Sequence, residues 1–122
     1  MPVTLQQMMA EANAAVERIS VEEAQKKLDE GALLLDIRDA TELSASGRVA
    51  GSHHVSRGML EFRADPASPF HDSTFSKDRT ILLHCASGGR AALAGKLLKD
   101  MGYASVYNTG GLSDWATAGA MI

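Results

Sequence analysis

The chain has 122 residues, of which 45% are hydrophobic, and a formal net charge of −3. This length and composition suit one globular domain with a buried core, and they exclude fibrous and intrinsically disordered chains. The basic residues are scattered, so neither nucleic acid nor an acidic membrane surface is an expected partner. The single cysteine cannot form an internal disulfide, which favours a reducing compartment. Because no apolar run approaches ~18 residues and the first residues lack a secretory pattern, we expect a cytoplasmic protein.

The first half of the chain contains three helix-starting patterns. A polar N-cap residue followed three positions later by Gln or Glu occurs at 4–7, 20–23 and 39–42. The second of these predicts a helix over 21–29. The apolar run 32–35 predicts a strand that is buried on both faces.

The second half continues this alternation. Residues 57–79 are the least regular, because two prolines remove backbone donors, although a helical turn is expected at 59–62. Strands are expected at 51–55, 81–84 and 105–108, and helices at 90–101 and from 112 onward. Strands that alternate with helices over short links are typical of an α/β fold with a parallel sheet covered on both faces.

The segment that follows the strand at 81–84 carries most of the chemical information. Cys85 directly follows this strand, at the mouth of the loop, and a helix is expected to begin a few residues later. Free backbone N–H groups and the positive end of the helix dipole meet there, which lowers the pKa of a thiol and makes it a nucleophile at neutral pH. Gly88 and Gly89 allow several N–H groups to turn toward one anion. Arg90 either binds an anionic substrate or pairs with a carboxylate.

The spacing between Cys85 and Arg90 limits what the loop can hold. Cys-x4-Arg is a ring of six residues, whereas phosphotyrosine phosphatases have one residue more and accommodate a tetrahedral phosphoryl group. The tighter ring suits a terminal sulfur on the cysteine, a persulfide, whose charge the loop amides would share without a metal. The alternative interpretation is that Cys85 is a small buried hydrophobe at a strand end.

Three other motifs accompany this loop, and each is weak alone. They are Asp36-Ile37-Arg38 with Glu42, the stretch Gly47-Arg48-Val49-Ala50-Gly51-Ser52, and Gly110-Gly111-Leu112 with Trp115. Together with Cys85-Ala86-Ser87-Gly88-Gly89-Arg90, in this order over about residues 20 to 119, they resemble the motifs of the single-domain rhodanese-like sulfurtransferase family.

The resemblance implies a rhodanese-like three-layer α/β domain over 20–122, with a central parallel sheet of about five strands flanked by helices, after an N-terminal helical extension over 1–19. It implies an enzyme in which Cys85 takes sulfane sulfur from thiosulfate or a persulfide and passes it to cyanide or a thiol. A protein sulfur donor or acceptor is equally compatible with it. The expected persulfide-binding residues are Ala86, Ser87, Gly88, Gly89 and Arg90, and those expected to support the site are Asp36, Arg38 and Glu42.

Other classes of function fit the residues less well. No metal or cofactor is expected, because the adjacent His53 and His54 point to opposite faces of a strand and no metal-ligand spacing occurs. A thiol redox protein would need a second cysteine from a partner. A non-enzymatic binding module of the same fold would not require the cysteine and glycines that this chain has. The short loop argues against a phosphatase, and an arsenate reductase is the other less favoured enzyme. Since the side chains between Cys85 and Arg90 are uncharged, thiosulfate is expected to be a modest donor.

Overall fold

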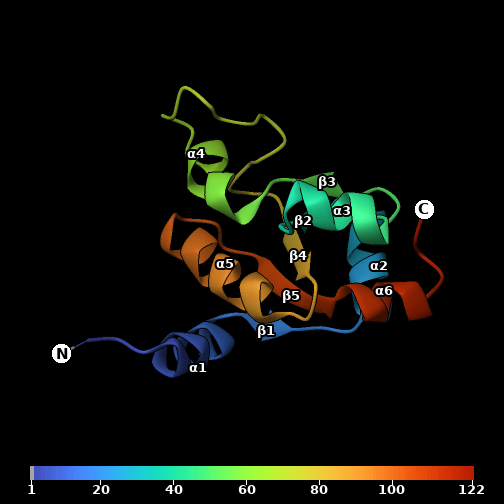
Figure 1. Cartoon of the computed structure of the whole chain (residues 1–122). Coiled ribbons are helices and arrows are strands. Elements are labelled where there is room, and N and C mark those ends of the chain that lie inside the picture. Colours follow the sequence, from blue (N-terminus) through green and yellow to red (C-terminus); the bar gives the residue numbers. More distant parts are fainter. Residues whose placement is uncertain (1) are drawn as a thin grey trace.

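A five-stranded parallel sheet forms the centre of the protein in the computed structural model, which describes residues 2–122 (Figure 1). The strands lie in the order β1-β5-β4-β2-β3, and every neighbouring pair is parallel. Their bounds are β1 Glu17–Arg18, β2 Leu33–Asp36, β3 His53–His54, β4 Ile81–Cys85 and β5 Val106–Gly111. The expected α/β fold with about five parallel strands is confirmed.

Within residues 2–122, six α-helices surround the sheet, and a short 3₁₀ turn, η1 (Arg57–Met59), precedes the fourth. The capping pattern at residues 4–7 forms as expected, because Thr4 Oγ1 accepts from the Gln7 backbone N–H at 3.1 Å. The pattern at 20–23 caps the second helix in the same way. The helices are α1 Leu5–Ala15, α2 Val21–Asp29, α3 Ala40–Ser46, α4 Leu60–Ala64, α5 Gly89–Asp100 and α6 Leu112–Thr117.

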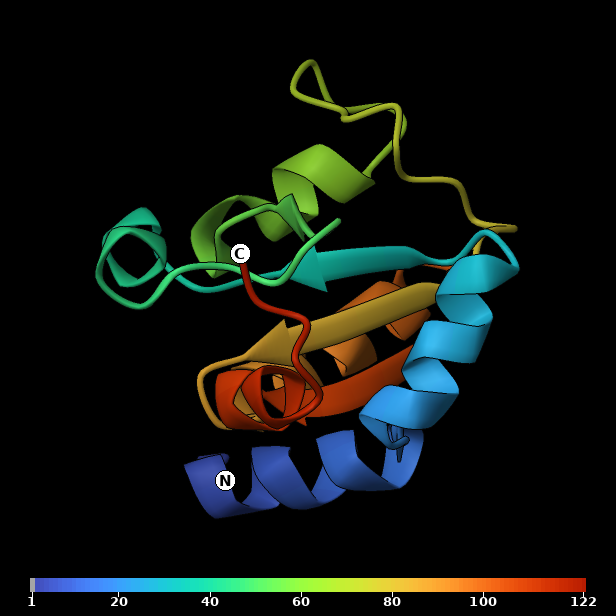
Figure 2. The same cartoon turned by 90° about the vertical axis from the view of Figure 1, so that its right-hand side faces the viewer.

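Successive side chains of β2 and β4 alternate between two hydrophobic clusters, one on each face of the sheet. Leu33 and Leu35 face α4 and α5, whereas Leu34 and Leu82 face α2 and Trp115. Figure 2 shows α2 and α6 in front of the sheet and α5 behind it. Because all residues of both strands are buried, their apolar residues 33–35 and 81–83 follow one another without the polar alternation of a strand that has one face in water.

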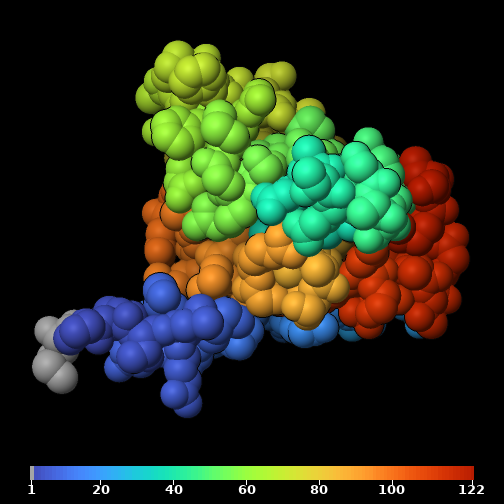
Figure 3. Space-filling model, in the orientation of Figure 1, coloured from blue at the N-terminus to red at the C-terminus, as the bar shows by residue number. Residues whose placement is uncertain are grey.

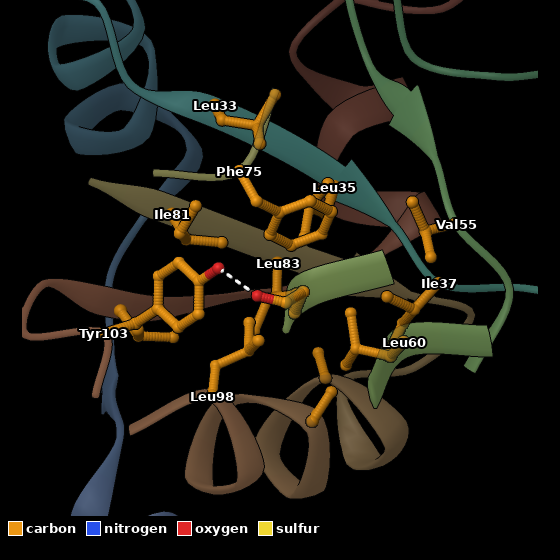
Figure 4. Close-up of a cluster of buried hydrophobic side chains, with 14 of the residues drawn as sticks. Leu33, Leu35, Ile37, Val55, Leu60, Phe75, Ile81, Leu83, Leu98 and Tyr103 are labelled. Carbon is orange, nitrogen blue, oxygen red and sulfur yellow. Dashed lines mark hydrogen bonds between the residues drawn. The ribbon is translucent and has the colours of Figure 1, made fainter. Parts of the chain in front are cut away.

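The hydrophobic cluster on the α4 and α5 face also includes side chains from the irregular segment 57–79. Leu60 of α4 lies among the apolar side chains of β2 and β4, and Phe75 lies close to the ring of Tyr103 (Figure 4). The Tyr103 hydroxyl donates to the Ala64 carbonyl at 2.6 Å. This buried hydrogen bond connects the end of α4 to the chain that follows α5.

The N-terminal segment is docked on α5 and continues into the sheet (Figure 1). Gly95 makes close packing possible, because a Cβ at this position would lie 2.9 Å from both methyl groups of Val16. Residues 17–18 then pair with β5 as its outer neighbour. The sequence did not predict this edge strand within residues 1–19. None of the helices in residues 2–122 is both long and apolar enough to cross a membrane.

Candidate active site

Cys85 is the last residue of β4, and its side chain lies beneath the loop that leads to α5. The residue is 1% exposed and belongs to the apolar cluster on the α5 side of the sheet. The Gly88 N–H nevertheless donates a hydrogen bond to Sγ at 3.0 Å. Cys85 is therefore both buried, as the alternative interpretation requires, and in contact with a backbone donor, as a stabilised thiolate requires.

The loop conformation depends on Gly88, which has a φ of 102° and is the N-cap of α5. This left-handed conformation turns the Gly88 N–H toward Sγ and is favourable only for glycine. The Gly88 carbonyl accepts from Asn108 Nδ2 at 3.1 Å and from the Ala92 N–H at 3.1 Å. Ala86 and Ser87 are exposed on the outside of the loop, so the loop backbone is held from β5 and from the helix while its outer surface stays open.

Gly111 holds the other side of the loop. It forms a bridge with Ser87, and Ala86 accepts from the Leu112 N–H at 3.2 Å. A Cβ on Gly111 would lie 2.4 Å from the Ala86 carbonyl oxygen, closer than any real side chain approaches. The second glycine of the Gly-Gly motif therefore permits the loop to rest directly on the end of β5.

Arg90 braces the loop through a carboxylate. Its Nη1 and Nη2 donate to the two Glu42 carboxylate oxygens, each at 2.8 Å. These hydrogen bonds, together with that from the Asp39 backbone N–H, lower the pKa of Glu42 to about 2, and the same pair raises the pKa of Arg90 above its ordinary value. Of the two roles expected for Arg90, the structure shows the carboxylate pair, which joins the loop to α3.

Asp36 and Arg38 form a second ion pair that is almost fully buried. Arg38 Nη2 donates to Asp36 Oδ2 at 2.7 Å and to the Gly47 carbonyl at 2.8 Å, and Arg38 Nε donates to Asp36 Oδ1 at 3.0 Å. Burial acts to raise the pKa of Asp36, but the Arg38 hydrogen bonds outweigh it and the pKa falls below its ordinary value. The pair fixes the turn after β2 and connects it to the Gly47 carbonyl.

His84 lies beside this pair, opposite Asp36 in the register of β2 and β4. It is completely buried and near the Trp115 ring, and its Nε2 is 3.6 Å from Asp36 Oδ2, beyond hydrogen-bonding distance. Burial lowers the pKa of His84 and so favours the neutral ring, although the Asp36 charge opposes this. Trp115 is also buried, and its Nε1 donates to Thr109 Oγ1 at 3.0 Å. Both residues pack beneath the site.

Sequence reasoning missed one charged residue at the loop, Arg18 of β1. A Cβ on Gly88 would lie 3.1 Å from Arg18 Nη1, so the guanidinium lies against the loop backbone. Arg18 precedes all four motifs and lies outside every predicted strand, so no pattern in the sequence places it beside the loop. The uncharged loop therefore has a cation beside it from another strand.

The Glu42–Arg90 pair predicts an acid-sensitive stability. Because the pKa of Glu42 falls from its ordinary 4.5 to about 2 on folding, its stabilising contribution is present above pH 4.5 and is lost as the pH drops from 4.5 toward 2. The free energy of unfolding, measured with urea across this window, should fall more steeply for the wild type than for Glu42→Gln. Glu30→Gln, at the exposed end of α2, is the control. Equal slopes for the wild type and Glu42→Gln would contradict the prediction.

Comparison with known proteins is consistent with this geometry. The family model of the rhodanese-like domain matches residues 20–118. A protein named sulfurtransferase from Allochromatium vinosum is 32% identical over 94 residues, which cover 76% of this chain and 79% of that protein. Thiosulfate sulfurtransferase GlpE from Actinobacillus succinogenes is 30% identical over 91 residues, 74% of each chain.

A solved structure from Rhodopseudomonas palustris is similar over the whole chain. It is 36% identical, with a TM-score of 0.86 and coverage of 100% of this chain and 98% of that one. That protein is described as being of unknown function and a possible tyrosine phosphatase. The match of the family model, the curated relatives at 30% identity or more and the four motifs around Cys85 lead to one conclusion: this chain belongs to the rhodanese-like domain family.

Proposed function

We propose that the protein is a sulfurtransferase that carries sulfane sulfur as a persulfide on Cys85. The main supporting observation is the Gly88 N–H at 3.0 Å from Sγ, within a six-residue loop at the N-terminus of α5. Two curated relatives carry the names sulfurtransferase and thiosulfate sulfurtransferase. The function assigned to Cys85 matches both the chemistry of this loop and those names.

In the first step the Cys85 thiolate attacks the outer, sulfane sulfur of the donor. A bond forms between Sγ and that sulfur, and the bond within the donor breaks, with its electron pair leaving on sulfite when the donor is thiosulfate. In the second step a nucleophilic acceptor, cyanide or a thiolate, attacks the outer sulfur of the persulfide. The Sγ–S bond breaks, and its electron pair restores the Cys85 thiolate. The two steps balance without an electron carrier.

The loop stabilises the negative charge in both states. The Gly88 N–H donates to Sγ in the free enzyme, and the proposal assigns the backbone N–H groups of residues 86 to 90 the role of stabilising an added sulfur. Because these donors are backbone groups held by α5 and β5, they need little reorganisation during transfer. The Arg90–Glu42 pair holds the loop, so the proposal gives Arg90 a bracing role.

The compartment follows from the same chemistry. A carrier thiol must be reduced before it can accept sulfur, and Cys85 has no second cysteine in the chain with which to form a disulfide. A reducing environment such as the cytoplasm is therefore part of the proposal. A small-molecule donor and a thiol acceptor suffice for turnover, and a protein donor or acceptor would use the same Sγ.

A phosphatase is the second candidate, because the similar structure from Rhodopseudomonas palustris is described as a possible tyrosine phosphatase. The loop of this chain has four residues between Cys85 and Arg90, one fewer than the phosphatase ring. In addition, the Arg90 guanidinium is bound to Glu42 through both terminal nitrogens, which leaves it poorly placed to bind a phosphoryl group. The six-residue loop therefore suits sulfur transfer better than phosphoryl transfer.

The proposal is tested by intact-protein mass after incubation with thiosulfate and, separately, with a small persulfide. The wild type should gain one sulfur atom, which cyanide or excess thiol should remove, whereas Cys85→Ser should gain none. Circular dichroism of Cys85→Ser checks that the variant is folded. Absence of sulfur loading from every donor, while the thiol still reacts with iodoacetamide, would exclude this function. Hydrolysis of an aryl phosphate in the same preparation would support the phosphatase instead.

A further inference from the structure

Asn108 of β5 lies beside the active-site loop and is almost completely buried, with 2% of its surface exposed. Its Nδ2 donates to the Gly88 carbonyl at 3.1 Å, and its Oδ1 accepts from the Gly110 N–H at 2.8 Å. Because a carbonyl can only accept and an N–H can only donate, these two partners determine which way the amide points. One side chain therefore connects the loop before α5 to the end of β5.

The contact with Gly88 acts on the residue that faces the thiol. The Gly88 N–H donates to Cys85 Sγ at 3.0 Å, and Gly88 has a φ of 102°. Its carbonyl accepts from Asn108 and also from the Ala92 N–H at 3.1 Å. Glycine has more backbone freedom than any other residue, so these contacts to its carbonyl restrict the direction of its N–H. Asn108 thus acts on Sγ through the Gly88 backbone.

The contact with Gly110 stabilises a bulge in the sheet. Between the paired positions 83–108 and 85–111, β4 has one residue and β5 has two. A β-bulge of this kind leaves the extra residue without a ladder partner and changes the direction of its strand. Gly110 has a φ of 88°, and the Asn108 side chain satisfies its N–H. The bulge is followed by Gly111, which pairs with Cys85 and bridges to the loop at Ser87.

The backbone of Asn108 is held on both sides by the sheet. It pairs with Leu83 of β4 and with Arg18 of β1, and its carbonyl accepts from the Ile19 N–H at 3.0 Å. The outer side of the loop is open by comparison, since residues 86–87 are exposed. In Figure 3 the light orange segment that joins β4 to α5 lies at the surface, below the teal α3 and beside the red C-terminal segment. The loop is therefore held mainly from its inner side.

We propose that Asn108 is a positioning residue for Cys85: its amide holds the Gly88 N–H on Sγ and so stabilises the thiolate that accepts sulfur. The inference rests on the proposed sulfurtransferase function and adds a residue that lies outside the Cys85–Arg90 loop. Hydrogen bonds to charged groups are stronger than those to neutral ones, so the Gly88 N–H favours the thiolate over the thiol. A group that keeps this N–H aligned makes Cys85 the better nucleophile at neutral pH.

The first test follows alkylation of Cys85 by iodoacetamide as a function of pH, which requires no sulfur transfer. Asn108→Leu preserves the size of the side chain and removes both hydrogen bonds. Asn108→Ser introduces no charge and can still accept from the N–H two residues further on, but it is too short to reach the Gly88 carbonyl. Both variants should move the midpoint of the pH–rate profile upward by about one pH unit. Below the midpoint this corresponds to about 10-fold slower alkylation.

Thr109→Val is the matched control for a buried hydrogen bond lost from the same strand. Thr109 is as buried as Asn108, and its hydroxyl donates to the Leu83 carbonyl and accepts from Trp115 Nε1. This variant should lose stability in thermal unfolding but keep the wild-type midpoint. A loop that is merely loosened would expose the thiol and speed alkylation at every pH without moving the midpoint. Circular dichroism checks folding, and Asn108→Ser is sufficient if the leucine variant does not fold.

The outcomes separate the role of Asn108 from the proposed function. An unchanged midpoint in Asn108→Ser, or an equal change in Thr109→Val, would overturn the role of Asn108 even if the wild type loads sulfur from thiosulfate. Slower loading of Asn108→Ser below the midpoint, with wild-type loading of Thr109→Val, would support it. A moved midpoint in a protein that no donor loads would exclude the sulfurtransferase function and retain Asn108 as the residue that positions a reactive thiol.

Discussion

Arg38→Met is expected to lower the free energy of unfolding by about 3–5 kcal/mol, because it leaves a buried carboxylate without its partner. Asp36 is fully buried and receives hydrogen bonds from Arg38 Nε, Nη2 and backbone N–H. Methionine preserves most of the side-chain volume but removes the charge and the donor to the Gly47 carbonyl. Urea denaturation at neutral pH measures the loss.

A double substitution separates the lost pairing from lost packing. Asp36→Leu combined with Arg38→Met removes both charges, and paired replacement of this kind is often neutral or stabilising. The double variant should therefore be more stable than Arg38→Met alone. Arg63→Met, at an exposed position of α4, controls for a general effect of removing an arginine. A loss below about 1 kcal/mol for Arg38→Met would mean that the pair contributes no more than an exposed one.

Gly111→Ala is expected to displace the active-site loop and to abolish most of the sulfur loading of Cys85. The added Cβ would lie 2.4 Å from the Ala86 carbonyl oxygen and 2.9 Å from Ser87 Cα. Both are backbone atoms, so no side-chain rotation relieves the contact. A displacement of about 1 Å costs on the order of 100-fold in rate, and overpacking costs about 1–3 kcal/mol in stability. Sulfur loading of Cys85 and thermal unfolding measure the two effects.

Gly58→Ala provides the matched control for this change. A Cβ at Gly58 would meet no heavy atom within 4 Å, and its φ lies outside the left-handed region. This variant should load sulfur at the wild-type rate. If Gly111→Ala also loaded and alkylated Cys85 at wild-type rates, the contact between the Gly-Gly motif and the loop would not position the thiol.

Local patterns in the sequence predicted most of the fold. The Ser20 cap predicted a helix over 21–29, and the structure has α2 at Val21–Asp29. The apolar runs of β2 and β4 predicted buried strands, since a strand covered on both faces needs no polar alternation. The loop between β4 and α5 was predicted from one cysteine, two glycines and the helix that follows.

Contacts between distant residues could not be predicted in this way. Glu42 and Arg90 are separated by 48 residues, so their pairing depends on how α3 and α5 are placed by the sheet. The strand β1 has only two residues and exists because β5 offers it a partner. For the same reason, the approach of Arg18 to Gly88 requires the complete strand order.

The strand order also determines which strands form the two edges of the sheet, where strands of other chains could pair. Both outermost strands, β1 and β3, are only two residues long. An exposed strand edge presents free N–H and C=O groups that can pair with a strand of another chain, and long flat edges lead to aggregation. One edge strand, β1, consists of the charged residues Glu17 and Arg18, and the other, β3, consists of His53 and His54. Neither edge therefore offers the long, flat row of free backbone groups on which a strand of another chain could pair.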